Sequence, residues 1–295
     1  MRHVPVMVTE ILQALAVHPG GIYVDATVGT GGHAEAILKA TAPTGRVIGI
    51  DRDDAALTVA EERLRPYRAR CTLIQGNFAD MGGIVRSQGC SMVDGILSDL
   101  GMSSLQVDTA ERGFSFAKRG PLDMRMDRNQ PTTAAQLVNE ATEQELAAWL
   151  HRYGEERFST RVARAIVQRR AVAPFMDTVE LAEVARAAIP AKYRRRSIDP
   201  ATRIFQALRI VVNGELINIE RLLGVAPHCL KPEGRLAVLS YHSLEDRLVK
   251  GRFRELAATP VFALVTKKPL VPSAGEVKRN RRARSAKLRV LIREP

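Results

Sequence analysis

The stretch Tyr23-Val-Asp-Ala-Thr-Val-Gly-Thr-Gly-Gly-His33 decides the fold of this chain. Residues 22–24 are an apolar run that predicts a buried strand, and Asp25 stands at its end. A glycine loop follows, and residues 33–39 then have the composition of a helix. A strand, a glycine turn and a helix N-terminus together form a binding corner for nucleotide-type ligands, because glycine lets the backbone approach a ligand closely.

Two acidic residues limit the classes of ligand that this corner could bind. Residues 29–34 fit the dinucleotide pattern G-x-G-x-x-G/A, which alone is a weak signal. A second predicted strand, 47–50, ends in Asp51, where an acid binds the ribose diol of NAD or of S-adenosylmethionine. Asp25 directly before the loop favours the methyl donor. The alternative is a glycine turn that binds no ligand.

The strand pattern continues along the chain and extends the predicted site. Asp99 follows the fourth strand, where open α/β sheets bind ligands, although a helix cap is the alternative role. Phe78, after the third strand, could stack on an adenine or belong to the core. Further strands are predicted at residues 72–74, 93–97, 236–239, 261–266 and 288–292.

The alternation of strands and helices stops in the middle of the chain. Between about residues 105 and 214 the pattern is helical and punctuated by prolines, which predicts a helical insertion between strands four and five. Its helices are expected at residues 134–139, 143–153, 159–170 and 178–188. Thr142 and Glu145 have the spacing of a capping box.

Positive charge indicates a polyanionic partner. The chain has a net charge of +12, and residues 267–295 carry ten Lys or Arg against two Glu, a net of +8. A second basic cluster is Lys192 with Arg194, Arg195 and Arg196. Such clustering is typical of nucleic-acid binding, and a solvated basic surface is the alternative. Residues 267–284 are short of apolar side chains and are expected to be mobile without a partner.

Other features bear on the compartment and on metals. No apolar run is long enough to span a bilayer, and the first residues lack a signal-peptide pattern, so we expect no membrane partner. The cysteines at 71, 90 and 229 lie far apart, which favours a reducing cytoplasm and argues against a disulfide framework. No metal site is evident. The oligomeric state is not fixed by the sequence, and a homodimer remains open.

Ten short motifs lie in order over nearly the whole chain: residues 3–7 (HVPVM), 25–33, 94–104, 111–116 (ERGFSF), 120–127 (GPLDMRMD), 153–156 (YGEE), 200–203 (PATR), 205–210 (FQALRI), 240–247 (SYHSLEDR) and 283–285. Taken together, they resemble the bacterial ribosomal RNA small-subunit methyltransferase H family, also called RsmH or MraW. The glycine loop is generic, whereas the later motifs are specific to that family.

The resemblance implies an enzyme that uses S-adenosylmethionine to methylate the N4 amino group of one cytidine in 16S rRNA, at the decoding centre of the small ribosomal subunit. It implies a Rossmann-like class I methyltransferase fold of the α/β class, with a seven-stranded, mostly parallel sheet. The methyltransferase domain would comprise residues 1–104 and 215–295, the latter with a basic C-terminal loop. Residues 105–214 would be the inserted helical subdomain for substrate recognition.

Carried over to this sequence, the resemblance implies a set of cofactor contacts: Gly31, Gly32, His33, Asp51, Phe78, Asp99 and Gln106. This chain departs from the family pattern at three positions. Asp199 replaces a usual His, Leu105 replaces a common Pro, and Tyr241 replaces a common Phe.

Candidate catalytic residues follow from the chemistry. Cytosine N4 is a poor nucleophile, so a catalyst must orient the amine and provide a route for its proton. We expect Asp99 to orient the donor or the amine and His242 to contact the base or its backbone, with a structural histidine as the alternative for His242. Candidate substrate contacts are the ring of Tyr241 and the basic residues Arg125, Arg194, Arg195, Arg196, Arg282 and Arg284.

Other functions remain open on the sequence alone. A methyltransferase of the same fold could act on DNA or protein, since a basic tail does not distinguish RNA from DNA. A dinucleotide-dependent oxidoreductase could use the same glycine corner. A non-catalytic RNA-binding module is a further alternative, against which the apparently intact donor corner argues.

Overall fold

The structure is a computed structural model, and it describes residues 4–194 and 199–295. The chain divides into two compact units. The sheet unit comprises Met1–Ser103 and Leu216–Pro295, and the helical unit comprises Ser104–Glu215. In sequence, the helical unit is therefore an insertion after the fourth strand of the sheet unit.

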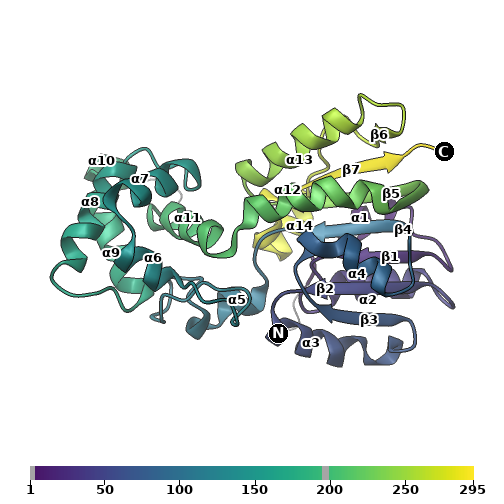
Figure 1. Cartoon of the computed structure of the whole chain (residues 1–295), viewed down its shortest axis with the longest axis horizontal. Helices are drawn as coiled ribbons and strands as arrows, with labels where there is room; N and C mark the ends of the chain where they lie inside the picture. Colours follow the sequence, from purple (N-terminus) through teal and green to yellow (C-terminus); the bar gives the residue numbers. More distant parts are fainter. Residues whose placement is uncertain (1–3, 195–198) are drawn as a thin grey trace. The chain divides into compact units, whose positions relative to one another are not determined.

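A single seven-stranded sheet forms the centre of the sheet unit, and Figure 1 shows its strands side by side in the order β3-β2-β1-β4-β5-β7-β6. β1 to β5 pair in parallel, whereas β7 runs antiparallel to both β5 and β6. The predicted seven-stranded, mostly parallel, Rossmann-like sheet is thereby confirmed. The strands are β1 Ile22–Asp25, β2 Arg46–Asp51, β3 Cys71–Gln75, β4 Val93–Asp99, β5 Leu230–Ser240, β6 Phe262–Leu264 and β7 Lys287–Arg293.

Helices cover both faces of the sheet, because successive residues of a strand point to opposite faces. Tyr23 packs into the core that includes residues of α1, α2 and α3, whereas its neighbour Val24 packs into the core that includes residues of α4, α12 and α13. Both side chains are fully buried. The helices are α1 Val8–Ala14, α2 Gly32–Ala40, α3 Asp54–Leu64, α4 Met81–Ser87, α12 Glu215–Val225, α13 Ser243–Leu256 and α14 Ala274–Arg279, with 3-10 turns η1 Arg65–Tyr67, η2 Phe78–Asp80, η4 Ala226–Cys229 and η5 Arg281–Ser285.

The strand register gathers three acidic residues at the carboxyl edge of the sheet. Asp25 pairs with Gly49 of β2 and with Leu97 of β4. Asp51 and Asp99 each lie two residues beyond those partners, so the period of two places both side chains on the same face as that of Asp25. The strand order also reverses around β1, and open α/β sheets bind their ligands at such a reversal.

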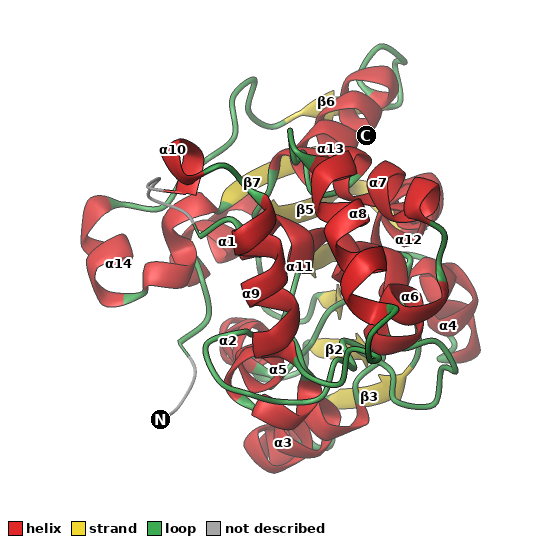
Figure 2. Cartoon of the chain, turned by 90° about the vertical axis from the view of Figure 1, so that its left-hand side faces the viewer, coloured by secondary structure: helices red, strands yellow, loops and turns green. Residues whose placement is uncertain are grey.

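The helical unit has its own buried core. Figure 2 shows its helices in red and the loops that join them in green. Its α7 begins with the predicted capping box, in which Thr142 accepts a hydrogen bond from the Glu145 amide and the Glu145 carboxylate accepts one from the Thr142 amide. The helices are α5 Ser104–Asp108, α6 Ala134–Glu140, α7 Glu143–Arg152, α8 Ser159–Arg170, α9 Thr178–Ala188, α10 Ala191–Arg194 and α11 Ala201–Asn213, with the 3-10 turn η3 Ala110–Arg112.

The basic segment 267–284 differs from its prediction as a loop. It contains α14 and most of η5. The Ser273 hydroxyl caps α14 by accepting a hydrogen bond from the Glu276 amide, and the Glu276 carboxylate accepts one from the Met7 amide at 2.6 Å. The Asn280 side chain donates to the Val4 carbonyl. The folded segment therefore makes contacts with N-terminal residues that are distant in sequence. A local sequence pattern does not reveal such contacts.

A buried ion pair within the helical unit provides a test of its packing. Both Arg209 and Glu215 are buried, and the guanidinium donates two hydrogen bonds of 2.8 Å to the carboxylate. Glu215→Gln removes the charge of one partner from a buried ion pair, so we expect the unit to lose about 3–5 kcal/mol of unfolding free energy. Urea unfolding followed by the fluorescence of Trp149, the single tryptophan of the chain, measures this loss.

The matched control removes an exposed ion pair from the same unit. Glu143 and Arg164 lie 3.4 Å apart with both side chains largely exposed, and Glu143→Gln should cost less than about 1 kcal/mol. Equal losses in the two variants would contradict the role given to the buried pair.

Candidate functional site

The glycine loop after β1 takes a backbone shape that side chains disfavour. Gly29 has φ +50° and Gly31 has φ +80°, both in the left-handed region. A Cβ on Gly31 would lie 3.1 Å from the Leu64 side chain, and one on Gly32 would lie 3.0 Å from Pro5. The predicted cofactor residues Gly31 and Gly32 therefore occupy places where a larger residue would force the loop to move.

Two of the strand-end carboxyls have strongly perturbed acidity. Asp25 is fully buried, and burial raises its pKa to about 7, an effect that nearby Asp99 and Asp51 reinforce and that His33 opposes. Burial likewise raises the pKa of Asp51 to about 6, although its carboxylate accepts hydrogen bonds from the Gly29 and Asp53 amides. Like charges held together out of water favour protonation or a cationic ligand.

Asp25 also has a buried carboxyl oxygen whose hydrogen-bonding capacity is not satisfied by the described residues. Its Oδ1 accepts a hydrogen bond from the Thr27 amide at 3.3 Å. Its Oδ2 is buried and has no hydrogen-bond partner among the residues that the structure describes. A buried carboxyl oxygen without a partner is costly. The amino group or another cationic part of a ligand would satisfy it.

Asp99 is held at the end of β4 from three sides. Its amide donates to the Thr27 hydroxyl at 2.6 Å, and its Oδ1 accepts from the Tyr241 hydroxyl at 2.6 Å. Its Oδ2 lies 3.4 Å from Nε2 of His33. Burial and the neighbouring Asp99 raise the pKa of Tyr241 well above its ordinary value, so its hydroxyl stays a donor at neutral pH. The predicted residues His33, Asp99 and Tyr241 thus meet at one point.

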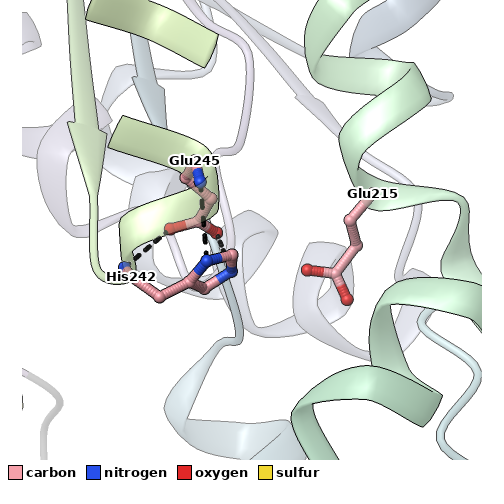
Figure 3. A group of neighbouring side chains, drawn as sticks. All are labelled: Glu215, His242 and Glu245. Carbon is pink, nitrogen blue, oxygen red and sulfur yellow. Dashed lines mark hydrogen bonds and ion pairs between the residues drawn. The ribbon is translucent and has the colours of Figure 1, made fainter. Parts of the chain in front are cut away.

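His242 has a structural role that its sequence position did not reveal. It is the N-cap of α13, and its ring Nδ1 accepts from the Glu245 amide. The buried Glu245 carboxylate accepts from the amides of Tyr241 and His242 and lies 3.1 Å from Nε2 of His242 (Figure 3). This geometry matches the structural alternative for His242, and its catalytic role stays a prediction.

Two further predicted cofactor residues, Phe78 and Gln106, lie in different units of the chain. Phe78 begins η2 after β3 and is half-buried against the core that includes residues of α4 and α12. Gln106 is buried in α5 of the helical unit. The structure places Phe78 at the same edge of the sheet as Asp51, since both follow the carboxyl ends of paired strands.

Among the predicted substrate residues of the helical unit, Arg125 is bound to groups of its own loop. The Arg125 guanidinium binds both carboxylate oxygens of Asp123 and the carbonyls of Arg128 and Gln130. A side chain so occupied organises its own loop, and its contact with RNA stays a prediction. Arg194 is the last residue of α10, its side chain is not described, and Arg195 and Arg196 lie outside the described residues.

The predicted basic residues of the sheet unit are exposed. Arg282 and Arg284 lie on η5. Lys278 and Arg279 are exposed on the preceding α14. Among the described residues, no helix is both long and apolar enough to cross a bilayer.

Two site residues were not singled out from the sequence. Thr27, inside the glycine loop, fixes the backbone of Asp99 across the strand boundary, and only the pairing of β1 with β4 makes this visible. Glu245 holds the end of β5, and its spacing of three from His242 is a capping-box signal. Because histidine is not among the common N-cap residues, that signal is easily missed.

Comparison with known proteins agrees with the geometry. The sequence pattern of the MraW methylase family matches residues 1–294. The chain is 47% identical to ribosomal RNA small subunit methyltransferase H of Syntrophobacter fumaroxidans, covering 100% of this chain and 97% of the relative. It is 50% identical to the protein of the same name from a Cyanothece strain, covering 99% and 94%.

A solved structure supports the fold. A crystal structure assigned as an rRNA methylase from Clostridium thermocellum superimposes with a TM-score of 0.50 at 12% identity, covering 100% of this chain and 99% of that one. The methylase family supports S-adenosylmethionine as the cofactor, as the sequence predicted.

Gly31→Ala tests the glycine loop. A left-handed alanine costs about 1–2 kcal/mol, and here it also crowds Leu64. We expect the affinity for S-adenosylhomocysteine, measured by isothermal titration calorimetry, to fall at least tenfold. Gly89→Ala is the control, because Gly89 has φ +73° with open space around its Cβ position. It should cost similar stability and leave the affinity unchanged; an equal loss of affinity would refute the assignment.

The raised carboxyl pKa values predict a pH dependence of donor binding. A positively charged ligand lowers the pKa of nearby carboxyls, so binding near pH 6.5 should release protons from Asp25 and Asp51, whose pKa values are about 7 and about 6. Affinity for S-adenosylmethionine should therefore rise with pH between about 6 and 7. Calorimetry in buffers of different ionisation enthalpy counts the protons released.

Two comparisons control this measurement. S-adenosylhomocysteine has one positive charge fewer and should release fewer protons. Asp25→Asn removes the group whose pKa is about 7 and should release fewer with either ligand. Proton uptake on binding, or no difference between wild type and Asp25→Asn, would show that these carboxyls do not face the ligand's charge.

Proposed function

Because the chain belongs to the MraW methylase family, we propose that it transfers a methyl group from S-adenosylmethionine to the N4 amino group of a cytidine in 16S rRNA. The target would lie at the decoding centre of the small ribosomal subunit, in the cytoplasm. The observation that carries this proposal is the cluster of three acidic residues beside the glycine loop, which suits a cationic methyl donor.

The residues of the sheet unit fit this donor. The backbone of Gly31 and Gly32 offers close approach, and Asp51 at the end of β2 is the acid expected on the ribose diol. Phe78 is the candidate for the adenine, and the unpartnered Oδ2 of Asp25 suits the amino group. When bound, the donor supplies a methyl group made electrophilic by its sulfonium charge.

Asp99 is the group best placed to act on the acceptor amine. Methylation of an exocyclic amine leaves a proton that must depart, and a carboxylate can accept an N–H hydrogen bond and orient the lone pair. The Asp99 side chain is 21% exposed, while Tyr241 and Thr27 fix its position. We assign Asp99 to orienting the amine or the donor, with its Oδ2 facing His33.

The basic surface of α14 and η5 supplies the RNA contact of the sheet unit. Lys278, Arg279, Arg282 and Arg284 are all exposed there. Contacts with phosphates would fix the register of the RNA without reading its sequence. We assign recognition of the RNA around the target base to the helical unit as well, including the segment that carries Arg194, Arg195 and Arg196.

The alternatives left open by the sequence make different predictions. An oxidoreductase would bind a nicotinamide cofactor, whereas a buried acid such as Asp25 beside the loop disfavours the negative pyrophosphate. A nicotinamide dinucleotide should therefore leave the melting temperature unchanged. A methyltransferase for DNA or protein would keep donor binding and fail to label RNA.

Methyl transfer from labelled S-adenosylmethionine to small ribosomal subunits that lack the modification tests the proposal. Nucleosides are identified by mass spectrometry after digestion. We expect N4-methylcytidine, and a loss of turnover of about 100-fold or more in Asp99→Asn. Tyr241→Phe removes one hydrogen bond to Asp99 and should slow turnover by about tenfold, with the same product.

Glu255→Gln is the matched control, since Glu255 and Arg252 form an exposed ion pair in the last turns of α13. It should retain full turnover. Label on another nucleoside, or no label on RNA despite intact donor binding, would reject the proposed substrate while leaving the cofactor assignment intact.

A further inference from the structure

A small basic hollow lies on the sheet unit beside α13, apart from the glycine loop. It is shallow and partly open to solvent, so it could hold a small group at the surface and could not enclose a cofactor. Residues of α13, β7 and the turn after β6 line it. Phe253 and Val290 are buried beneath it.

The rim of the hollow is positively charged and lacks acidic partners. Lys250, Arg254 and Lys267 are exposed there, and among the described residues none of them forms an ion pair. Lys250 and Arg254 are four residues apart on α13, so they present like charges on one helical face, which destabilises a helix. An anionic ligand bound between these side chains would offset their repulsion.

Arg289 completes the hollow as an oriented donor. Its side chain is only 13% exposed, and its Nε donates to Asp246 at 2.7 Å. Its terminal amino groups have no hydrogen bond to the described residues. Asp246 also binds Lys287, and these two partners keep the pKa of Asp246 below its ordinary value despite its burial. The carboxylate of Asp246 is therefore already engaged by two cations, and part of the Arg289 fork remains available.

This donor set suits a phosphate. Lysine ammonium groups act as point charges on phosphates, and an arginine fork donates to phosphate oxygens with fixed geometry. A carboxylate ligand would not need several cations around one small hollow.

The candidate site lies at the start of α13, and the hollow lies farther along the same helix. α13 starts directly after Tyr241 and His242, and Tyr241 contacts Asp99. Lys250 and Arg254 follow the first residue of α13 by seven and eleven positions, which is about 10 and 16 Å along a helix. At about 3.4 Å per nucleotide of a stacked strand, this corresponds to a few nucleotides.

We propose that the hollow formed by Lys250, Arg254, Lys267 and Arg289 binds a backbone phosphate of the RNA substrate, a few nucleotides from the methylated base. This inference rests on the proposed function and adds a contact outside the basic α14 and η5. It makes α13 a link between Tyr241 at the catalytic end and the RNA backbone.

The test is the triple variant Lys250→Gln/Arg254→Gln/Lys267→Gln, which keeps Arg289 and its bond to Asp246. Binding to small ribosomal subunits is measured over a series of salt concentrations. We expect affinity about tenfold weaker near 150 mM salt and a slope of log K against log salt that is less steep by about 0.7–0.9, which is the contribution of one phosphate contact. KM for the subunit should rise with kcat and S-adenosylhomocysteine affinity unchanged.

The matched control removes three exposed arginines elsewhere on the same unit: Arg46→Gln/Arg65→Gln/Arg68→Gln. These residues lie near the amino ends of β2 and β3 and form no ion pair among the described residues. Equal loss of affinity in both triple variants would overturn the inference and leave only general electrostatic attraction. If the wild type fails to methylate or bind small subunits, the proposed function fails instead.

Discussion

The register of β1 against β2 and β4 is the constraint on which the rest of the site depends. It aligns Asp25, Asp51 and Asp99 on one face at the carboxyl edge of the sheet, and Asp25 is fully buried there. Burial raises the pKa values of Asp25 and Asp51 and therefore opposes folding at neutral pH, because the folded chain binds protons that the unfolded chain releases. A cationic ligand reverses that cost.

The end of β5 is organised around this same edge. Glu245 caps the first turn of α13 and holds the backbone of Tyr241, whose hydroxyl then reaches Asp99. A substitution of the common Phe by Tyr thus adds a fixed donor to the central carboxylate. The other end of the chain contributes too, because Glu276 of α14 binds the amide of Met7 in the segment where Pro5 approaches Gly32. The N-terminal segment therefore contacts both α14 of the basic surface and the glycine loop.

The sequence predicted the parts of this arrangement that depend on local patterns. α8 and α9 have the predicted bounds because their apolar positions repeat with the helical period. β5 was predicted only at 236–239, since Pro232 and Gly234 interrupt its first half. The Tyr241–Asp99 bond and the helix α14 depend on partners distant in sequence, and no local pattern carries that information. The acids at strand ends were visible, whereas their common register was not.

The melting temperatures of wild type and Asp25→Asn at pH 8, each with and without S-adenosylmethionine, test the central claim most directly. Above its pKa of about 7 the buried Asp25 carboxylate is charged, so we predict that the variant melts higher than wild type without ligand and gains less from it. A variant that melts lower without ligand and gains as much from S-adenosylmethionine would contradict the claim that the carboxyl cluster is held for a cationic donor.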